Sequence, residues 1–361
     1  MNEANSSIPW ENYVHVGRES AIVLGNRGPL SLDNSGQLTD EILNAYHKYG
    51  FYVFTSVLSP EETNELTIEL DAIMENAPVS RDKSVDQMGR PSKFAEYYSL
   101  TEDELPVCRL LSHPIMMSEA ALRASAHPKI LKVAASINGP DFIPFTDVIQ
   151  YKVSHNGAPT HWHQDGRTHW TEEGAALEQP DGSGKTHGFN LSIACTSCIP
   201  ENCLWVVPGS QYQWRVANGG KFPPITERIP EAVPVLMEPG DCVIVNRSSL
   251  HGSYPNKSSE RRMTLLLGFH KRSSAVDIET TNVHAFIRTG TTPVSMKYTV
   301  DRVLKRSRMI PLAIDARRQR YTEEEAFEYQ GAFIGGADWN EQSRSEITEE
   351  GKEYWQLDMT L

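Results

Sequence analysis

Hydrophobic and polar positions along this chain follow two periods, and the change comes near residue 140. In the earlier part the clearest apolar repeat has helical spacing and consists of Leu66, Leu70, Ile73 and Met74. That spacing predicts a helix that buries one stripe of its surface. From Phe142 onward the period is two, with Ile149, Tyr151 and Val153 alternating with Val148, Gln150 and Lys152. The pattern therefore predicts helices first and β-strands afterwards.

The helical part carries clear start and stop signals. Asp40 to Tyr49 predicts a helix that ends at Gly50, because glycine accepts the left-handed conformation common at a helix C-terminus. The run from Ser59 to Glu62 starts the next helix with a capping box and with proline at the first position. His113 to Ser136 predicts one or two further helices, whereas residues 76–112 are polar and irregular and predict a surface loop.

The β-rich part consists of short apolar runs separated by turn signals such as Pro208-Gly209-Ser210 and Glu238-Pro239-Gly240-Asp241. The predicted strands after the one that begins at Phe142 are Thr160–Asp165, Phe189–Cys195, Leu204–Val207, Val233–Met237, Cys242–Asn246 and Met263–Phe269. Such strands favour an antiparallel barrel or jelly roll. Because the helices precede the strands and do not alternate with them, a parallel βαβ sheet is disfavoured. The predicted fold class is mostly β with flanking helices.

We expect one domain over residues 1–361, with appendages. Its predicted parts are an N-terminal arm (1–38), a helical support (39–140), a jelly-roll core (141–272) and a C-terminal extension (273–361). A glycine-rich insertion at 166–188 leaves the core and is placed to act as a lid. The extension holds basic runs and a capped acidic helix that is predicted to begin with Thr322-Glu323-Glu324-Glu325. The charges of these runs are expected to pair or to be solvated. It also offers a surface for a homo-oligomer.

Composition narrows the possible partners and the compartment. The formal net charge of -13 argues against a nucleic-acid or anionic-membrane partner, because phosphates are bound by clustered Lys and Arg. The chain has no signal-peptide pattern and no apolar run near the roughly 20 residues that span a bilayer. Five cysteines, three of them at Cys195, Cys198 and Cys203, suggest a reducing, cytoplasmic setting. They are interpreted as buried and inert, although a metal or redox role is the alternative.

Candidate chemistry begins at His161-Trp162-His163-Gln164-Asp165. On a strand, His163 and Asp165 point to one face and can reach a single metal ion. A third ligand should come from a strand alongside, and His251 is the best candidate. Two histidines and one carboxylate form the facial triad that holds Fe(II) and leaves positions open for O₂. His161 shares the same face and is expected to line the pocket or to support a ligand without binding the metal.

Arg262 follows His251 by eleven residues, with a hairpin signal between them at Pro255–Ser258. The chain can therefore return and place Arg262 beside the metal, where a guanidinium can bind a carboxylate through two parallel hydrogen bonds. The distal carboxylate of 2-oxoglutarate needs such a partner. Ser253 and Gln150 could donate further hydrogen bonds to this co-substrate, and Lys152 either faces the pocket or lies at the rim of the barrel.

These motifs resemble the phytanoyl-CoA dioxygenase family of Fe(II)/2-oxoglutarate oxygenases. The similarity runs from about residue 39 to 270 and rests on Trp162–Asp165, on the spacing His251-x-Ser253-x-x-Asn256-x-Ser258-x-x-x-Arg262, on Tyr49–Val53 with Leu58–Glu62, and on Leu204–Ser210. The resemblance implies a double-stranded β-helix, or cupin-like jelly roll. It also implies that His163, Asp165 and His251 are iron ligands and that Arg262 binds the co-substrate.

The expected activity is O₂-dependent oxidation, such as hydroxylation, of a C–H bond in a small molecule of specialised metabolism, with release of succinate and CO₂. Asp165 favours this outcome, because related halogenases lack that carboxylate. Arg167, His169 and Trp170 begin the insertion and either contact substrate or are exposed. Two alternatives stay open: a non-catalytic jelly-roll protein that binds a small molecule, and a zinc-dependent hydrolase, which would give Arg262 no purpose.

Overall fold

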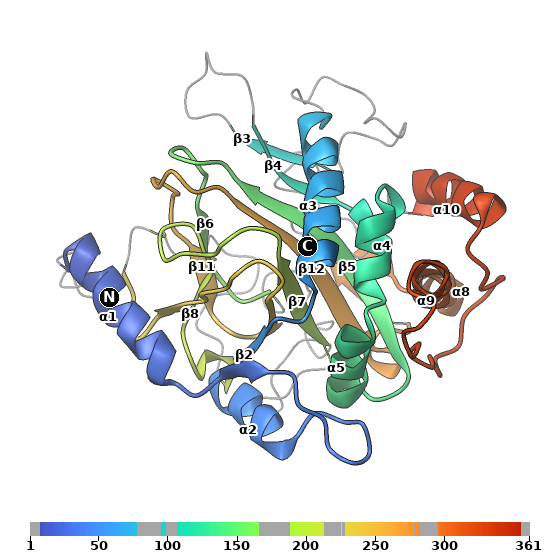
Figure 1. The fold of residues 1–361 in the computed structure, drawn as a ribbon, viewed down its shortest axis with the longest axis horizontal. Coiled ribbons are helices and arrows are strands. Elements are labelled where there is room, and N and C mark those ends of the chain that lie inside the picture. Colours follow the sequence, from blue (N-terminus) through green and yellow to red (C-terminus); the bar gives the residue numbers. More distant parts are fainter. Residues whose placement is uncertain are drawn as a thin grey trace.

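Two β-sheets face each other at the centre of the molecule (Figure 1). The computed structural model describes residues 8–77, 95–98, 107–165, 188–212, 225, 228–277, 279–281 and 295–354. The eight strands of the large sheet are, in spatial order, β1 (Arg27–Pro29), β2 (Phe51–Thr55), β10 (Cys242–Asn246), β7 (Gly188–Ala194), β12 (Arg262–Lys271), β5 (Phe142–Lys152), β4 (Val107–Ser112) and β3 (Ala95–Tyr98). The small sheet consists of β6 (Thr160–His163), β11 (His251–Ser253), β8 (Trp205–Val206) and β9 (Val233–Pro234). A separate ribbon pairs β13 (Glu279–Thr281) with β14 (Ser295–Lys297).

The large sheet is buried on both faces, which explains its nearly continuous apolar strands. On β10, Val243 and Val245 belong to the core cluster that also contains Trp162 and Trp205 of the small sheet. Ile244, between them, belongs to the second cluster, which includes the helices on the other face. Apart from the parallel pair β1–β2, the strand pairs of this sheet are antiparallel. The predicted jelly roll with flanking helices is confirmed.

Helices cover the outside of both sheets (Figure 1). They are α1 (Trp10–Val23), α2 (Asp40–Tyr49), α3 (Pro60–Glu75), α4 (Glu119–Ser125), α5 (Pro128–Asn138), α8 (Val300–Ser307), α9 (Met309–Arg320) and α10 (Glu341–Tyr354). The predicted end of α2 is confirmed, because Gly50 has φ 81°. The predicted start of α3 is also confirmed, since Ser59 and Glu62 form a reciprocal capping box.

The N-terminal arm contains a helix that the pattern did not predict. Helix α1 buries Tyr13, Gly17 and Ala21, and two of these three side chains are too small to give an apolar stripe. Tyr13 stacks on Trp205 with ring centroids 4.7 Å apart. A Cβ at Gly17 would lie 2.7 Å from the Trp205 ring, so glycine allows the helix to approach the small sheet closely.

Three other predictions need correction. Residues 76–112 are not loop throughout, because β3 and β4 extend the large sheet at its edge. The strand predicted as Thr160–Asp165 ends at His163. No helix starts at Thr322. After α9 the described chain becomes helical again only at Glu341. In the stretch between them, Glu324 forms an ion pair with Arg317.

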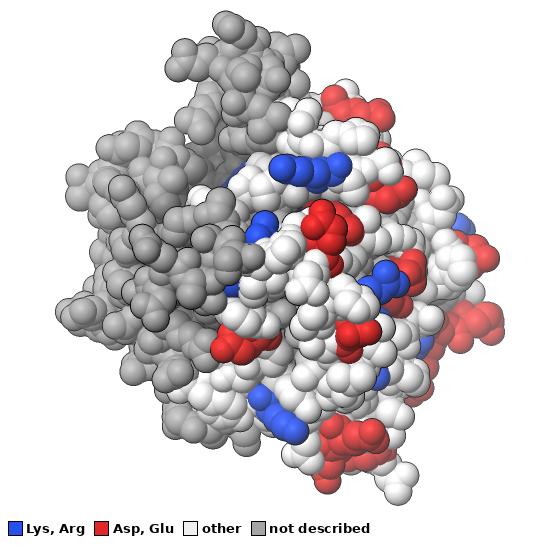
Figure 2. All heavy atoms as spheres, turned by 90° about the vertical axis from the view of Figure 1, so that its left-hand side faces the viewer, with Lys and Arg blue, Asp and Glu red and all other residues white. Residues whose placement is uncertain are grey.

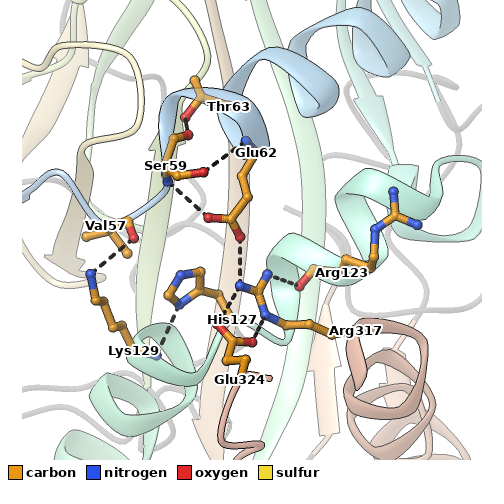
Figure 3. Close-up of polar contacts among 9 residues, drawn as sticks. All are labelled: Val57, Ser59, Glu62, Thr63, Arg123, His127, Lys129, Arg317 and Glu324. Atoms are coloured by element: carbon orange, nitrogen blue, oxygen red, sulfur yellow. Dashed lines mark hydrogen bonds and ion pairs between the residues drawn. The ribbon is translucent and has the colours of Figure 1, made fainter. Parts of the chain in front are cut away.

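The C-terminal extension packs on the helices through buried charges, and Arg317 of its basic run pairs with Glu324 of its acidic run, which was one of the two outcomes expected. Arg317 of α9 donates to Glu62 of α3 at 2.7 Å, to Glu324 at 2.8 Å and to the carbonyl of Arg123 at 3.3 Å (Figure 3). His127 lies beside this cluster and caps α5 by accepting the Lys129 N–H. Burial, together with Arg317, lowers the pKa of His127 to about 4, so this cap is neutral at pH 7.

On the face drawn in Figure 2, acidic and basic side chains of the described residues are interspersed. Across the described ranges, no helix is both long and apolar enough to cross a bilayer. The five cysteines are free and buried, and burial raises the pKa of both Cys195 and Cys198 to about 12. Both of these residues are therefore thiols at neutral pH, which agrees with the interpretation of buried, inert cysteines.

Candidate metal and co-substrate site

The small sheet brings two distant histidines side by side. His163 on β6 and His251 on β11 are direct partners in an antiparallel pair, and their ring centroids are 4.1 Å apart. Asp165 lies just beyond the end of β6, with its Oδ1 3.3 Å from His163 Nε2 and 3.8 Å from His251 Nε2. One ligand atom from each of the three residues lies within 4.8 Å of the others. Two nitrogens and one oxygen in this arrangement fit a facial triad.

The neighbours of His163 fix the chain on both sides. Trp162 is fully buried and meets the ring of Tyr254 edge to face at 6.2 Å. Gln164 is also fully buried, and its Nε2 donates to the carbonyl of Ser248 at 2.6 Å. The backbone N–H of Asp165 donates to the carbonyl of Arg247 at 2.9 Å. These anchors hold His163 and Asp165 next to the segment that leads into His251.

Both histidines present the same nitrogen to the site. His163 Nδ1 is 2.7 Å from the carbonyl of His161, and His251 Nδ1 is 2.8 Å from the carbonyl of Ser249. A carbonyl only accepts, so each Nδ1 carries the proton and each Nε2 keeps its lone pair. Such outer hydrogen bonds are typical of metal-binding histidines.

The protonation states also suit metal binding. Burial, helped by His163, lowers the pKa of His251 to about 4, so its imidazole is neutral at pH 7. Burial alone would raise the pKa of Asp165, but interactions with His251, His163 and Arg247 outweigh it and hold the pKa well below its usual value. The site therefore offers an ionised carboxylate and a neutral imidazole without any change of protonation.

A pocket of about 110 Å³ opens beside the triad. Its described lining includes His163, Asp165 and His251, and on the large sheet Gln150, Lys152 and Arg262. Lys152 and Arg262 are register partners of β5 and β12. Lys152 is buried, and its Nζ donates to Ser253 Oγ at 2.8 Å and to the carbonyl of Tyr254. Lys152 therefore faces the pocket, which decides the alternative that the sequence left open.

Arg262 is a buried guanidinium for which the described residues offer no partner. Its side chain makes no hydrogen bond or ion pair with the described part of the chain, and its Nε is both buried and unsatisfied. The ionisable groups that most favour its charge are Cys198 and Cys203, whose thiol pKa values are themselves raised by burial. A buried charge is expensive unless it is paired, so the pocket is suited to an incoming anion.

The segment between His251 and Arg262 is not the hairpin that was expected. Strand β11 belongs to the small sheet and β12 to the large sheet, so the turn crosses from one sheet to the other. Asn256 is fully buried and organises this crossing, because its amide donates to the carbonyls of Val153 and Glu260 and its Oδ1 accepts from Ser258. The crossing still places Arg262 in the pocket.

Some predicted site residues lie elsewhere. Arg167, His169, Trp170 and most of the predicted lid fall outside the described residues. His161 is exposed and is not among the residues lining the pocket; its Nδ1 accepts the N–H of Ile225 at 3.2 Å. The expectation that it points into the pocket was wrong, because its ring instead accepts the hydrogen bond from Ile225.

Several further residues line the pocket without having been predicted, among them Asn190 and Arg109. Asn190 lies on β7, and with Ser192 it forms a polar alternation in an otherwise apolar strand, which was a usable signal. Arg109 lies on β4, inside the segment predicted as a loop, where the pairing of β3 and β4 shifts register. A β-bulge of this kind can redirect a side chain. No feature of the sequence indicated it.

Solved structures with this fold include metal-dependent oxygenases. The structure of EctD from S. alaskensis with 2-oxoglutarate and 5-hydroxyectoine superposes with a TM-score of 0.53 at 17% identity, over 68% of this chain and 80% of that chain. The carbocyclase SnoK from nogalamycin biosynthesis, described as non-heme and alpha ketoglutarate dependent, gives 0.51 at 18% identity, over 73% of this chain and 95% of that chain. The architecture is thus that of a cupin-like oxygenase.

Sequence comparison defines the family. The multifunctional dioxygenase prhA of Penicillium brasilianum is 26% identical over 241 residues, which are 64% of this chain and 72% of that protein. The ectoine dioxygenase of Nocardia farcinica is 24% identical over 176 residues, 48% of this chain and 52% of that protein. The family model for phytanoyl-CoA dioxygenase matches residues 46–264, so this chain belongs to the phytanoyl-CoA dioxygenase family. It is an oxidoreductase of the dioxygenase type.

Proposed function

We propose that this protein is an Fe(II)- and 2-oxoglutarate-dependent dioxygenase that oxidises a C–H bond of a small molecule, with release of succinate and CO₂. One observation carries the proposal: a buried guanidinium, Arg262, with no partner among the described residues, lines the same pocket as a cluster of two imidazoles and one carboxylate. A metal site alone would not need that cation. A co-substrate that chelates the metal at one end and presents a carboxylate at the other explains both features.

In this proposal His163, Asp165 and His251 hold Fe(II). The bound iron supplies O₂ activation, which no protein side chain can provide. The chain contributes the neutral Nε2 atoms and the ionised Asp165 carboxylate, already aligned by the hydrogen bonds at Nδ1 and by the anchors around residue 163. This preorganisation limits the rearrangement needed when metal binds.

Arg262 binds the distal carboxylate of 2-oxoglutarate through two parallel hydrogen bonds. Lys152 adds a second cation on the neighbouring strand, Ser253 offers its hydroxyl, and Gln150 offers its amide from the same pocket wall. Since the pocket is buried, these interactions are stronger than they would be in water. Because the same pocket offers a metal site and these cations, it favours a dicarboxylate over a monocarboxylic acid.

The substrate is proposed only by class. Relatives of this chain include an ectoine dioxygenase and a multifunctional dioxygenase, which supports a small molecule, in specialised metabolism, as the substrate. Arg167, His169 and Trp170 remain predicted substrate contacts. We further propose a cytoplasmic enzyme with one catalytic domain over residues 1–361, without a nucleic-acid or membrane partner, and with a C-terminal extension able to join two subunits.

Anaerobic addition of Fe(II) and then 2-oxoglutarate to the purified protein tests the proposal. We expect the weak visible charge-transfer band of the chelate, and succinate release after air is admitted. Asp165→Ala should abolish the band, whereas His15→Ala, at an exposed histidine, should leave it unchanged. A zinc hydrolase or a binding protein without catalysis would give neither the band nor succinate, and that result would refute the proposed reaction.

A further inference from the structure

The two carboxylate oxygens of Asp165 have different surroundings. Oδ1 faces the Nε2 atoms of His163 and His251, at 3.3 and 3.8 Å. Oδ2 accepts a hydrogen bond from Nδ2 of Asn190 at 2.8 Å. Asp165 is almost fully buried and Asn190 is buried too, so water does not compete strongly for this bond. One oxygen is directed to the metal position and the other is held away from it.

The orientation of the Asn190 amide follows from its second contact. Arg247 is buried, and its Nη1 donates to Asn190 Oδ1 at 3.5 Å. A guanidinium only donates, so the amide oxygen must face Arg247 and the NH₂ group must face Asp165. The guanidinium of Arg247 itself lies over the Phe145 ring at 5.0 Å. The backbone carbonyl of Arg247 also receives the Asp165 N–H, so one residue supports Asp165 by two routes.

The fold leaves space for this amide. Asn190 on β7 is the register partner of Val245 on β10 and of Gly268 on β12. A Cβ at Gly268 would lie 3.4 Å from Asn190 Oδ1 and 2.7 Å from Thr146 Cγ2. Glycine at that position therefore gives room for both neighbours. Asn190 is therefore a polar residue on a buried strand, and the neighbouring Gly268 accommodates its amide.

We propose that Asn190, oriented by Arg247, is a positioning residue that reserves Asp165 Oδ2 and so keeps Asp165 a ligand through Oδ1 alone. This inference rests on the proposed function. A facial triad works because positions opposite the protein ligands stay open. A second carboxylate oxygen on the metal would occupy a position needed by the co-substrate or by O₂. Outer hydrogen bonds to ligating carboxylates are a general means of fixing ligand geometry.

Asn190→Leu tests the inference, because leucine has a similar size and cannot donate. Co(II) binding to the purified protein should be followed anaerobically by its visible absorption, and 2-oxoglutarate binding should then be measured at saturating Co(II). We expect the dissociation constant for 2-oxoglutarate to rise by at least about 10-fold, because the freed Oδ2 can take a metal position that the co-substrate needs, while the dissociation constant for Co(II) does not rise. General damage to the pocket would weaken the binding of both. Asn138→Leu is the matched control, since Asn138 is also a buried asparagine but lies at the end of α5, outside the described pocket lining.

Arg247→Met is the second variant, and it keeps Asn190 while removing the group that orients it. It should weaken 2-oxoglutarate binding in the same direction and to a smaller extent. Both variants binding 2-oxoglutarate at saturating Co(II) as tightly as the unmodified protein would overturn the inference about Asn190. Failure of the unmodified protein to bind metal and 2-oxoglutarate would instead refute the proposed function, so the two failures are distinguishable.

Discussion

The pocket and the C-terminal extension both bury cationic side chains, but the two regions differ in whether an acidic side chain pairs with the cation. In the described part of the extension, the buried arginines meet acids: Arg306 with Asp147 at 2.9 Å, Arg308 with Glu346 at 2.8 Å and Arg317 with Glu62 at 2.7 Å. In the pocket, Arg262 has no described partner and Lys152 has only neutral acceptors. A buried charge is tolerated when it is paired and costly when it is not. The paired cations hold elements together, whereas the unpaired ones mark where a ligand supplies the missing charge.

Adjacent residues at the start of β12 show the same contrast. Arg261, just before the strand, pairs with Asp71 of α3 through both carboxylate oxygens. Arg262, the first residue of β12, lines the pocket. Because neighbouring side chains in extended chain alternate between faces, a shift of one residue separates a structural arginine from the one proposed to bind the co-substrate.

The largest effect is expected for Arg262→Met. Removing the only guanidinium proposed for the distal carboxylate should weaken 2-oxoglutarate binding by roughly 2–5 kcal/mol, a factor of about 30 to several thousand. The free energy of unfolding of the ligand-free protein should not fall, because an unpaired buried charge is removed. Calorimetric titration and denaturant unfolding measure the two quantities. Arg261→Met is the matched control and should leave co-substrate affinity unchanged.

Arg317→Met should have the opposite profile. Glu62 and Glu324 would lose their shared cation at the contact drawn in Figure 3, so the free energy of unfolding should fall by about 3 kcal/mol. Folded molecules should still form the charge-transfer complex, since α9 contributes nothing to the pocket lining. Urea unfolding tests this, with Arg318→Met, at the exposed neighbouring position, as the control. Equal stability of the two variants would contradict a structural role for Arg317.

The ion pair between Asp147 of β5 and Arg306 of α8 predicts that acid destabilises the fold. Burial alone would raise the pKa of Asp147, but its hydrogen bond with His113 and the charge of Arg306 outweigh burial and lower the pKa to about 2. A carboxylate whose folded pKa is depressed stabilises the fold above its unfolded pKa and loses that effect as pH falls through the folded value. We expect about 2 kcal/mol to be lost between roughly pH 4 and pH 2. In Asp147→Asn, unfolding measured over this range should lack that component.

The smallest effect is expected at Lys152, where co-substrate binding should be linked to the uptake of a proton. Burial, followed by the charge of Arg262, lowers the pKa of Lys152 well below its usual value, while Cys203 opposes this and Arg109 adds the smallest lowering effect. An incoming carboxylate raises that pKa, so binding takes up a fraction of a proton, and affinity falls as pH rises above the free-site pKa. Calorimetry in buffers of different ionisation enthalpy measures this uptake. It should vanish in Lys152→Met and persist in Gln150→Ala.

Local patterns made much of the site predictable. His163 and Asp165 were found from their spacing of two, and His251 and Arg262 from their positions around a turn, because strand parity and turn chemistry act over a few residues. Three features depended on distant partners and could not be predicted this way. Helix α1 is defined by its fit to Trp205, and strand β4 with Arg109 by pairing at the edge of the sheet. The acidic run that was predicted as a helix contains Glu324, which forms an ion pair with Arg317.

Counter-charges from the extension reach into the oxygenase core, which has a practical consequence for shortening the protein. A chain cut to the matched residues 46–264 would keep Asp147 on β5 and Glu62 on α3 but would discard Arg306 and Arg317. Asp147 would then keep its contact with His113 but lose Arg306, and Glu62 would lose Arg317. Excising the family unit by its sequence limits should therefore yield an unstable fragment, although no ligand to the proposed metal would have been removed.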